Sequence, residues 1–539
     1  MSPSLLGFGR LAVIPCAALV VGVTGPPPPV HQFAAPHFAD SAVLTDDLLN
    51  DCGSPATTPV PDGAPIVVSL PPYTFTVGRI PSTAWRNPPS TDPGWRLAFE
   101  GFMYLPALAL RAYLDDQTAS LHRMVDQIAA FHLQNPDPGR SVYGWDEGTA
   151  QRRLQTENCL YVLTRDGRMR AGMTADAKVQ LGPRYYGPPY ARVHNHGLMA
   201  NLRIVRAGEL LAVLSWRTTG LSRMRSEAPL AFSPAGTTWE QASAYHQFTI
   251  QLWNQAVAFL ARHEPGSPAI ATIQAVTAKA LAVLSWMTEP DGQIVTVGDS
   301  PLQDGETRTS TARVFRDDAA GWLIGRWSWS DPLTTYYSIR YGPPRWAHGH
   351  EDRGAITWST WGSRVLVDPG RFDGDPASSW RTWQMSAPAH NAAVLAGTRL
   401  TSRAVRVTAG TVQAPAHAWQ VEDDLYPLHH VRTVNVYRDT RMLRLRDSFA
   451  GPGPFDQYFH LAPEWLLVSV SGDRHSAVFR LPSGRRLTVT TTGLIRQVVR
   501  GSAQPIAGWF FPDDGVRLAA YQLRIASLTR TISTALRVT

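Results

Sequence analysis

The chain has few cysteines and almost no lysine. Its 539 residues include three cysteines, Cys16, Cys52 and Cys159, and removal of an N-terminal leader would leave two, so no disulfide framework can be argued. Lysine occurs only at Lys178 and Lys279, and arginine therefore carries nearly all of the positive charge. Charged residues make up 17% of the chain and hydrophobic residues 44%. This composition indicates a globular protein and excludes a disordered one.

The net charge permits an acidic partner without identifying one. The formal charge is +7 at pH 7, and arginine's planar guanidinium suits carboxylate or sulfate groups. Genome base composition is a simpler explanation of so many arginines. No basic run alternates with aromatic residues, as a nucleic-acid-binding face would. We therefore expect no nucleic-acid partner.

A short apolar segment follows the first basic residue. Arg10 precedes an apolar run from Leu11 to Val23, and prolines occupy positions 26–29. The run is too short to cross a bilayer, and it predicts a possible secretory leader within residues 1–45. We therefore expect a secreted, periplasmic or cell-surface protein without a membrane span. A misassigned start codon, with a cytoplasmic protein, is the alternative.

Helical periodicity dominates the first half of the chain. Pro, Thr, Ser and Gly are frequent from Cys52 to Pro93, which predicts an extended lead-in. Apolar residues then recur at three- and four-residue spacing in six segments. These predicted helices are Leu97–Leu114, Ala119–Leu133, Asp146–Leu163, Asn195–Leu214, Trp239–Arg262 and Ile270–Trp286. We assign residues 46–305 to a helical domain with a broad core.

The pattern changes to short β-type segments near residues 300–315. They are rich in Trp, Tyr, Val, Thr and Ile and are divided by Gly, Pro and Asp. The predicted strands are Trp322–Trp329, Thr334–Tyr341, Ala355–Trp361, Val431–Tyr437, Met442–Leu445, Ala477–Leu481 and Leu487–Thr491. Successive strands without intervening helices favour an antiparallel β-sandwich. We assign this second domain to residues 306–539.

Three residues in the second half form a candidate metal site. His350, Asp368 and His390 offer two imidazoles and one carboxylate, a ligand set suited to zinc or a similar divalent ion. His348 lies two residues before His350. If this segment is a strand, both imidazoles point to the same face, so one can hold a metal while the other faces a substrate. The alternative is that His350 and His390 only form hydrogen bonds within loops.

The helical half holds a second group of candidates. Asn195 and His196 open a predicted helix, where an asparagine often serves only as a cap. Tyr245 lies on one helical stripe with Phe248 and Leu252, and such tyrosines more often belong to the core. The residues alone leave catalysis and structure both open.

Other catalytic signatures are absent or incomplete. The sequence has no Walker loop and no G-x-S-x-G nucleophile elbow. His348-x-His350-x-Asp352 is similar to the H-x-H-x-D-H metal motif of metallo-β-lactamase-fold hydrolases, but Arg353 stands where that motif needs its last histidine.

Taken together and in this order, the motifs resemble those of the heparinase II/III-like family of polysaccharide lyases. The resemblance runs from about Trp95 to the C-terminus. The matching segments are Tyr143-Gly-Trp145-Asp-Glu-Gly-Thr149 with Arg152 and Arg153, Asn195-His196-Gly197, Glu240-Gln-Ala-Ser243-Ala-Tyr245, His348-x-His350-x-Asp352, Asp368-Pro-Gly370 and Ala389-His390-Asn391. The resemblance implies an N-terminal (α/α) toroid followed by a C-terminal antiparallel β-sandwich, with the active-site cleft between them.

The resemblance also implies roles for individual residues. Such enzymes cleave uronic-acid polysaccharides by β-elimination and leave a C4–C5 unsaturated product. Asn195 would hydrogen-bond to the uronate carboxylate and neutralise its charge. Tyr245 would give a proton to the leaving oxygen and could also take the C5 proton on the same sugar face. His196 is the candidate base where the C5 proton lies on the other face, and His348 would assist at the substrate. By the same match, four residues would bind substrate: Trp145, Glu147, Arg152 and Glu240.

The metal then has a structural role. A divalent ion, Zn²⁺ by its ligands, would hold the sandwich loops, with Asn391 as a supporting residue. The expected partner is an acidic polysaccharide, and alginate, heparan sulfate, hyaluronan and a bacterial exopolysaccharide all remain open. Two other functions also remain: a metal-dependent glycan hydrolase, and a glycan-binding or assembly protein without catalysis.

Overall fold

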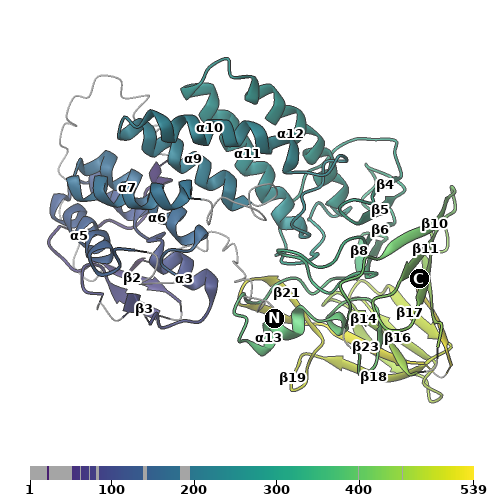
Figure 1. The fold of residues 1–539 in the computed structure, drawn as a ribbon. Helices are drawn as coiled ribbons and strands as arrows, with labels where there is room; N and C mark the ends of the chain where they lie inside the picture. Colours follow the sequence, from purple (N-terminus) through teal and green to yellow (C-terminus); the bar gives the residue numbers. More distant parts are fainter. Residues whose placement is uncertain are drawn as a thin grey trace, which may run out of the picture. The chain divides into compact units, whose positions relative to one another are not determined.

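The computed structural model divides the chain into two compact units, Met1–Glu227 and Ala228–Thr539, and each is considered by itself (Figure 1). The structure describes residues 21–22, 51–60, 62–71, 73–80, 84–85, 87–137, 143–182, 195–398, 400–451, 453–527 and 529–539. The predicted leader at residues 1–45 lies outside these residues, except for Val21–Gly22. The leader therefore stays a prediction.

The first unit is mainly helical. Its described helices are α3 (Pro93–Glu100), α4 (Pro106–Leu114), α5 (Thr118–Gln134), α6 (Glu147–Thr164), α7 (Gly167–Leu181), α9 (Asn195–Leu210) and α10 (Leu214–Glu227). A small sheet orders β1 (Val21–Gly22), β2 (Val67–Leu70) and β3 (Tyr73–Thr76) in sequence. Asp92, Asp146 and Asp166 cap α3, α6 and α7 by accepting backbone N–H bonds in the first turn.

The sequence predicted which helices exist more accurately than where each helix begins and ends. The single helix expected at Leu97–Leu114 is wrong, because α3 ends at Glu100 and Phe102 adopts a positive φ of 53°. A new helix begins at Pro106, whose missing N–H is tolerated only in a first turn. Likewise, α9 ends at Leu210. The periodicity did not predict α7 and α10, nor the β2–β3 hairpin inside the expected lead-in.

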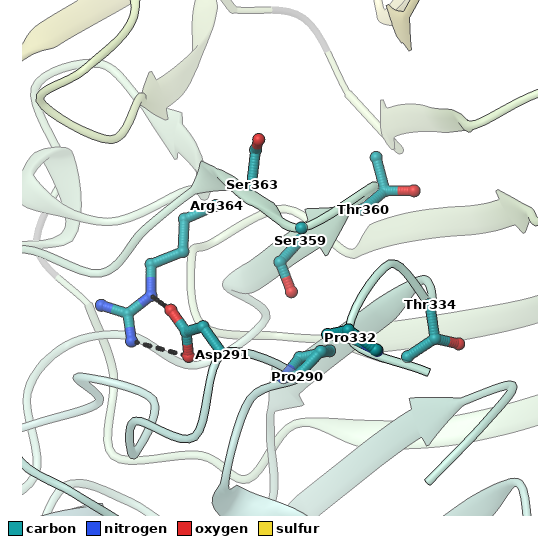
Figure 2. Close-up of a pocket in the computed structure, with 9 residues that line it drawn as sticks. Pro290, Asp291, Pro332, Thr334, Ser359, Thr360, Ser363 and Arg364 are labelled. Atoms are coloured by element: carbon teal, nitrogen blue, oxygen red, sulfur yellow. Dashed lines mark hydrogen bonds and ion pairs between the residues drawn. The ribbon is translucent and has the colours of Figure 1, made fainter. Parts of the chain in front are cut away.

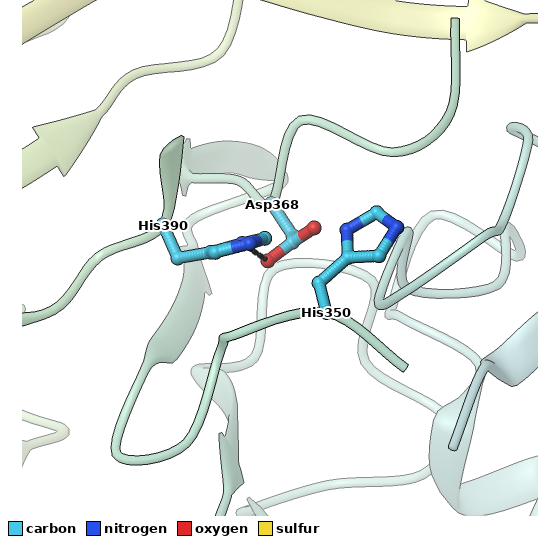
Figure 3. A group of neighbouring side chains, drawn as sticks. All are labelled: His350, Asp368 and His390. Atoms are coloured by element: carbon cyan, nitrogen blue, oxygen red, sulfur yellow. Dashed lines mark hydrogen bonds and ion pairs between the residues drawn. The ribbon is translucent and has the colours of Figure 1, made fainter. Parts of the chain in front are cut away.

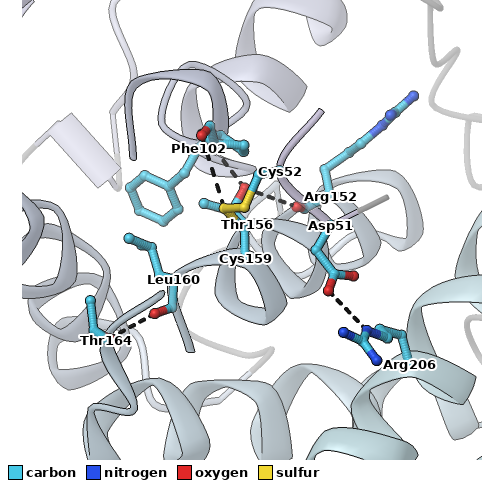
Figure 4. Close-up of a disulfide and its surroundings, with 10 residues drawn as sticks. Asp51, Cys52, Phe102, Arg152, Thr156, Cys159, Leu160, Thr164 and Arg206 are labelled. Carbon is cyan, nitrogen blue, oxygen red and sulfur yellow. Dashed lines mark hydrogen bonds and ion pairs between the residues drawn. A yellow bond between two sulfur atoms is a disulfide. The ribbon is translucent and has the colours of Figure 1, made fainter. Parts of the chain in front are cut away.

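A disulfide joins Cys52 to Cys159, 107 residues apart in sequence (Figure 4). Both cysteines are buried in the apolar core of the first unit. Figure 4 also shows Asp51, the residue before Cys52, in an ion pair with Arg206 of α9 at 2.8 Å. The segment that precedes the helices is therefore fixed to α6 covalently and to α9 by charge.

The second unit begins with two long helices. They are α11 (Ser243–His263) and α12 (Pro268–Met287), after a short 3-10 turn at Ala228–Leu230. By length and composition α12 could cross a membrane, and 44% of its most apolar 18-residue window is buried inside the structure. One such helix is weak evidence of a span, because core helices of other proteins pass the same test. The expected domain boundary at residue 305/306 differs from this division into compact units, and the functional limits of the domains stay predictions.

Antiparallel sheets form the rest of the second unit. A five-stranded sheet orders β4 (Val314–Asp317), β5 (Trp322–Arg326), β6 (Tyr336–Arg340), β7 (Ile356–Thr360) and β8 (Ser363–Leu366) in sequence. An eight-stranded sheet has the order β10 (Arg406–Val412), β11 (Ala416–Asp423), β12 (His430–Tyr437), β13 (Met442–Phe449), β24 (Thr531–Val538), β17 (Arg486–Thr491), β16 (Ser476–Arg480) and β15 (Leu466–Val470). A four-stranded sheet has the order β18 (Leu494–Arg500), β23 (Tyr521–Ala526), β14 (Phe455–His460) and β9 (Ala393–Leu395).

One apolar core joins these three sheets. It includes Tyr337 of β6, Leu445 of β13 and Leu523 of β23. In β11 and β12, buried and partly exposed residues alternate strictly, because successive side chains of a strand point to opposite faces. All seven strands predicted from sequence are present. Three shorter pieces complete the unit: hairpin β19 (Ser502–Ala503) with β20 (Ile506–Ala507), hairpin β21 (Trp509–Asp513) with β22 (Val516–Ala519), and helix α13 (Ser379–Gln384) before a 3-10 turn at Ala387–Ala389.

A buried charge network lies inside the sandwich. His430 contacts Asp423 at 2.7 Å and Asp447 at 2.9 Å, and Asp447 also pairs with Arg432 at 2.7 Å. Burial alone would lower the pKa of His430, but hydrogen bonds to the two aspartates raise that pKa to about 9. The folded state therefore favours the imidazolium form.

We predict that the free energy of unfolding falls as pH rises from about 6.5 to about 9. A histidine pKa raised by folding adds stability below its unfolded pKa, near 6.5, and the contribution is lost as pH rises through the folded pKa. The loss should be on the order of 3 kcal/mol. Urea denaturation at several pH values measures it. His430→Gln should flatten this slope, and an equal slope in both proteins would contradict the assignment.

Candidate active site and metal centre

Tyr245 and His348 form a stacked pair in the second unit. Their ring centroids are 3.4 Å apart and the rings lie within 9° of parallel. Tyr245 lies in the first turn of α11, whereas His348 lies in a turn between β6 and β7, and both side chains are buried. Gly298 permits this approach, because a Cβ at this position would lie 2.8 Å from the His348 carbonyl oxygen. Two residues predicted as catalytic are thus in direct contact.

Asp299 holds both histidines of the His348-Gly-His350 motif. Its Oδ2 lies 3.2 Å from His348 Nδ1, and its Oδ1 lies 2.9 Å from His350 Nε2. Arg381 of α13 donates to both carboxylate oxygens. Burial alone would raise the pKa of Asp299, but Arg381 and the two histidines hold it well below its ordinary value. The carboxylate is therefore ionised.

The expected strand at His348 and His350 is wrong. Both lie in a turn and irregular segment before β7, so strand alternation does not orient them. They are instead brought together by the two oxygens of one carboxylate. Sequence reasoning missed Asp299 and Arg381. The Gly298-Asp299-Ser300 turn was the available signal, but it indicated only a change of periodicity.

His350, Asp368 and His390 lie close enough to bind one ion (Figure 3). One possible ligand atom from each lies within 4.8 Å of the other two, and all three residues are buried. His390 Nδ1 contacts Asp368 Oδ2 at 2.7 Å. Within the described part of the chain, His350 Nδ1 and His390 Nε2 have no hydrogen-bond partner. Because the other nitrogen of His350 faces Asp299, its Nδ1 can carry a lone pair toward a cation.

Asp352 adds a second carboxylate near these ligands. It is fully buried, and neither carboxylate oxygen has a hydrogen-bond partner among the described residues. Arg340 Nε lies 3.8 Å from its Oδ1. Burial raises the pKa of Asp352, while Arg340, His390 and His350 act in the opposite direction. A buried carboxylate without hydrogen bonds is costly, and a nearby cation would offset that cost. The residues present therefore fit a divalent metal.

Asn391 bonds to the backbone beside the candidate metal ligands. Its amide donates to the carbonyl groups of Ile356 and Val367, and its oxygen accepts the N–H of His460. These bonds fix the residues next to Asp368 and His390. If these residues bind a metal, Asn391 supports them by fixing the backbone and not by bonding to a ligand side chain.

Asn195 and His196 lie in the first unit, as the first residues of α9. Both are buried. His196 packs against the start of α6, where a Cβ added to Gly148 would lie 3.0 Å from the imidazole ring. This contact explains the glycine in the Trp145-Asp-Glu-Gly segment. Burial and the charge of Asp146 raise the pKa of Glu147 to about 8.

The remaining predicted substrate-binding residues have different surroundings. Trp145 is 1% exposed and its indole donates to the Asn135 carbonyl at 3.2 Å. Arg152 is partly buried on α6. Glu240 is buried in the second unit, and its Oε2 lies 3.6 Å from His348 Nε2. Their contact with a substrate stays a prediction, and Glu240 is the one that touches the stacked pair.

A surface pocket elsewhere in the second unit contains none of these residues. Figure 2 shows Arg364 beside Asp291, with Ser359, Thr360 and two prolines around them. Arg364 Nε lies 3.0 Å from Asp291 and 2.8 Å from Glu289. Its charge is therefore balanced within the protein.

Residues 318–537 match the family described as "Heparinase II/III-like, C-terminal". This part of the chain is therefore a heparinase II/III-like C-terminal domain, and the family resemblance drawn from the motifs is confirmed for it. No curated protein matches the chain.

Two solved structures show the same architecture. A structure titled "Crystal Structure of Heparinase III" has 14% identity and a TM-score of 0.71, over 84% of this chain and 78% of that one. A mutant of the heparan sulfate lyase HepC from Pedobacter heparinus has 16% identity and a TM-score of 0.61, over 94% and 84%. The predicted fold class is thus confirmed: an N-terminal helical toroid followed by a C-terminal antiparallel sandwich. At this identity the likeness establishes the fold alone.

Proposed function

We propose that the protein is a polysaccharide lyase that cleaves a uronic-acid-containing polysaccharide by β-elimination. A base takes the proton at C5, its bonding electrons form the C4–C5 double bond, and the C4–oxygen bond breaks. The leaving oxygen then takes up a proton. The observation that carries this proposal is the stacked pair of Tyr245 and His348, since it places two proton-transfer groups in contact.

Tyr245 is assigned to the leaving oxygen. Arg371 is buried, pairs with Asp514 at 2.7 Å and acts electrostatically on Tyr245. A cation near a phenol favours the phenolate form. Tyr245 can therefore give up its proton to the leaving group and recover one afterwards.

His348 is assigned to proton transfer beside it. Burial is the largest effect on His348 and lowers its pKa, so the imidazole is neutral near pH 7. With Nδ1 donating to the ionised Asp299, Nε2 is free to accept a proton, and Glu240 lies 3.6 Å from that nitrogen. These contacts orient the base and stabilise its protonated form.

Asn195 and His196 are assigned as the sequence motifs indicate. The Asn195 amide would donate to the uronate carboxylate as negative charge builds on it, and loss of such a donor typically costs about 3 to 4 kcal/mol of barrier. His196 would serve as the base where the C5 proton lies on the other sugar face.

We predict that Tyr245→Phe lowers kcat by about 10²- to 10⁴-fold, because a general acid is lost while the ring remains. Turnover is measured as ultraviolet absorbance of the C4–C5 unsaturated uronate on heparan sulfate, alginate and hyaluronan. Tyr336→Phe is the matched control, since this buried hydroxyl donates to the Trp286 carbonyl outside the site. It should change stability but keep kcat.

Three outcomes would contradict the lyase assignment. Unchanged kcat in Tyr245→Phe would return this residue to a packing role. A saturated product would favour a hydrolase, and binding without any product would favour a glycan-binding protein.

We further propose that His350, Asp368 and His390 hold a divalent ion, zinc by ligand type, with a structural role. The proposal is supported by His350 Nδ1 and His390 Nε2, which have no hydrogen-bond partner among the described residues, and by the Asp352 carboxylate, whose oxygens accept no hydrogen bond there. When bound, the ion would supply positive charge that offsets these buried groups and links the segment after β6 to the loops at Asp368 and His390. His350→Ala, Asp368→Ala and His390→Ala should each lose the metal, whereas His348→Ala should retain it.

We predict opposite effects of Asp352→Asn with and without metal. With chelator, the variant should be at least as stable as the wild type, because it removes a buried carboxylate that accepts no hydrogen bond among the described residues. Its ion-pair partner Arg340, 3.8 Å away, keeps its bonds to the backbone carbonyls of Ala320 and Gly321. With Zn²⁺ at about 100 times its Kd, the wild type should gain about 2.7 kcal/mol and the variant clearly less. Thermal unfolding and elemental analysis measure this.

Asp447→Asn is the matched control for Asp352→Asn. Asp447 is equally buried but bonded to Arg432, His430 and Gln457. Its loss should destabilise the protein equally in both conditions. An equal loss in both conditions for Asp352→Asn would place Asp352 outside the metal centre.

We also propose that the protein works outside the cytoplasm. The disulfide between Cys52 and Cys159 supports this, because such bonds persist in oxidising compartments. The apolar segment at residues 11–23 is consistent with export.

We predict that reduction destabilises the first unit by about 2 to 4 kcal/mol, since a loop of 107 residues regains freedom in the unfolded state. Urea denaturation with and without reductant measures this change. Cys52→Ser/Cys159→Ser should match the reduced wild type and show no further response to reductant. Reactive thiols at both positions in natively purified protein would refute the assignment.

A further inference from the structure

A cluster of aromatic rings surrounds Arg517 in the second unit. The rings belong to Phe372, to Trp380 of α13 and to Trp509 of β21. Trp380 and Trp509 meet edge to face with centroids 5.6 Å apart, and Phe372 lies 5.2 Å from Trp380. We call these four residues the arginine–tryptophan cluster. Three separate segments build it, so its shape depends on the folded unit.

Arg517 is held by these rings without a balancing acid. Its guanidinium carbon lies 4.5 Å from the Trp380 centroid, 5.1 Å from that of Trp509 and 5.7 Å from that of Phe372. The residue is exposed. No ion pair or hydrogen bond of its side chain occurs within the described ranges. The rings thus orient a guanidinium whose donors remain available to an anion from solvent.

Other arginines near the cluster are already neutralised. Arg371 pairs with Asp514, in the turn of the β21–β22 hairpin that carries Arg517. Arg381, the residue after Trp380, pairs with Asp299. An anionic ligand therefore finds its available charge at Arg517.

The cluster is linked to the stacked pair by two short paths. Through α13, Trp380 is adjacent to Arg381, and Arg381 binds the Asp299 carboxylate that also contacts His348. Through the hairpin, Asp514 binds Arg371, whose charge acts on Tyr245. Both paths lie wholly within the second unit.

We propose that the arginine–tryptophan cluster is a subsite for an acidic sugar unit of the polysaccharide, beyond the unit that reacts. Arg517 binds a carboxylate or sulfate through its planar pair of N–H donors. The partly exposed faces of Trp380 and Trp509 pack against the apolar face of a pyranose ring. The inference rests on the lyase proposal for the meaning of the subsite, but its binding can be measured without turnover.

Arg517→Ala and Arg517→Lys test the subsite. On the polysaccharide that the wild type cleaves, Arg517→Ala should raise KM about tenfold while kcat changes by less than about twofold, as expected for a contact made equally in ground and transition states. Arg517→Lys keeps the charge but loses the paired donors, so it should recover only part of the affinity. The rise in KM should shrink on shorter oligosaccharides.

Arg441→Ala is the matched control. The Arg441 guanidinium carbon likewise lies over a tryptophan ring, 3.9 Å from the Trp361 centroid. Among the described residues it makes no contact with Asp299 or with the partners of Asp299. It should leave KM unchanged. The proposal would be overturned if Arg517→Ala and the wild type had equal KM values. It would also be overturned if Arg517→Ala lowered both kcat and thermal stability, because the cluster would then serve only packing.

A binding experiment separates this proposal from the lyase proposal. Calorimetry with heparin, which carries sulfates, and with alginate, which carries carboxylates alone, should show weaker binding to Arg517→Ala than to wild type and Arg441→Ala. If heparin binds Arg517→Ala more weakly than it binds the wild type and Arg441→Ala, but no unsaturated product forms on any substrate, the subsite proposal stands and the lyase proposal fails. If neither glycan binds the wild type, the subsite proposal is overturned.

Discussion

The carboxylate of Asp299 is the group on which the candidate site of the second unit depends. It is buried, and it remains ionised because Arg381 donates to both of its oxygens. One oxygen faces His348 and the other faces His350. Each imidazole therefore donates one N–H to Asp299 and keeps its other nitrogen for a separate task. A single buried ion pair thus fixes two tautomers, one that suits the proposed proton transfer and one that suits the proposed metal binding.

The same ion pair connects the proposed substrate subsite with the stacked pair of Tyr245 and His348. Arg381 lies on α13 next to Trp380, so the short helix carries both a partner of Asp299 and an aromatic face of the arginine–tryptophan cluster. Arg371 and Asp514 form a second link of the same kind. Arg381 is neutralised by Asp299, and Arg371 is neutralised by Asp514. Each ion pair therefore joins two segments of the second unit rigidly. An anionic sugar chain would then be attracted by Arg517 and not by the charges that hold the site together.

Much of the architecture follows from local patterns in the sequence, but the site does not. Alternation and aromatic content predicted seven strands that the structure contains, but missed others of the same sheets, such as β8, β14 and β23. Three- and four-residue spacing predicted α5, α6, α9, α11 and α12, but missed α7 and α10. The order of short motifs indicated the family before the fold was known. Asp299 could not be found in this way, because its partners lie 49, 51 and 82 residues away and are set by the packing of a turn against α13. The Cys52–Cys159 pairing is equally non-local.

The burial of the three proposed metal ligands bears on what a bound ion would do. A catalytic metal needs an open position for water or substrate, whereas a structural one is enclosed by protein. His350, Asp368 and His390 are at most 2% exposed, and Asp352 nearby is fully buried. His350 is also held by Asp299, the residue that orients His348. An ion in this position would act on the reaction through the placement of His348, and its loss would disturb the base while leaving Tyr245 on its helix.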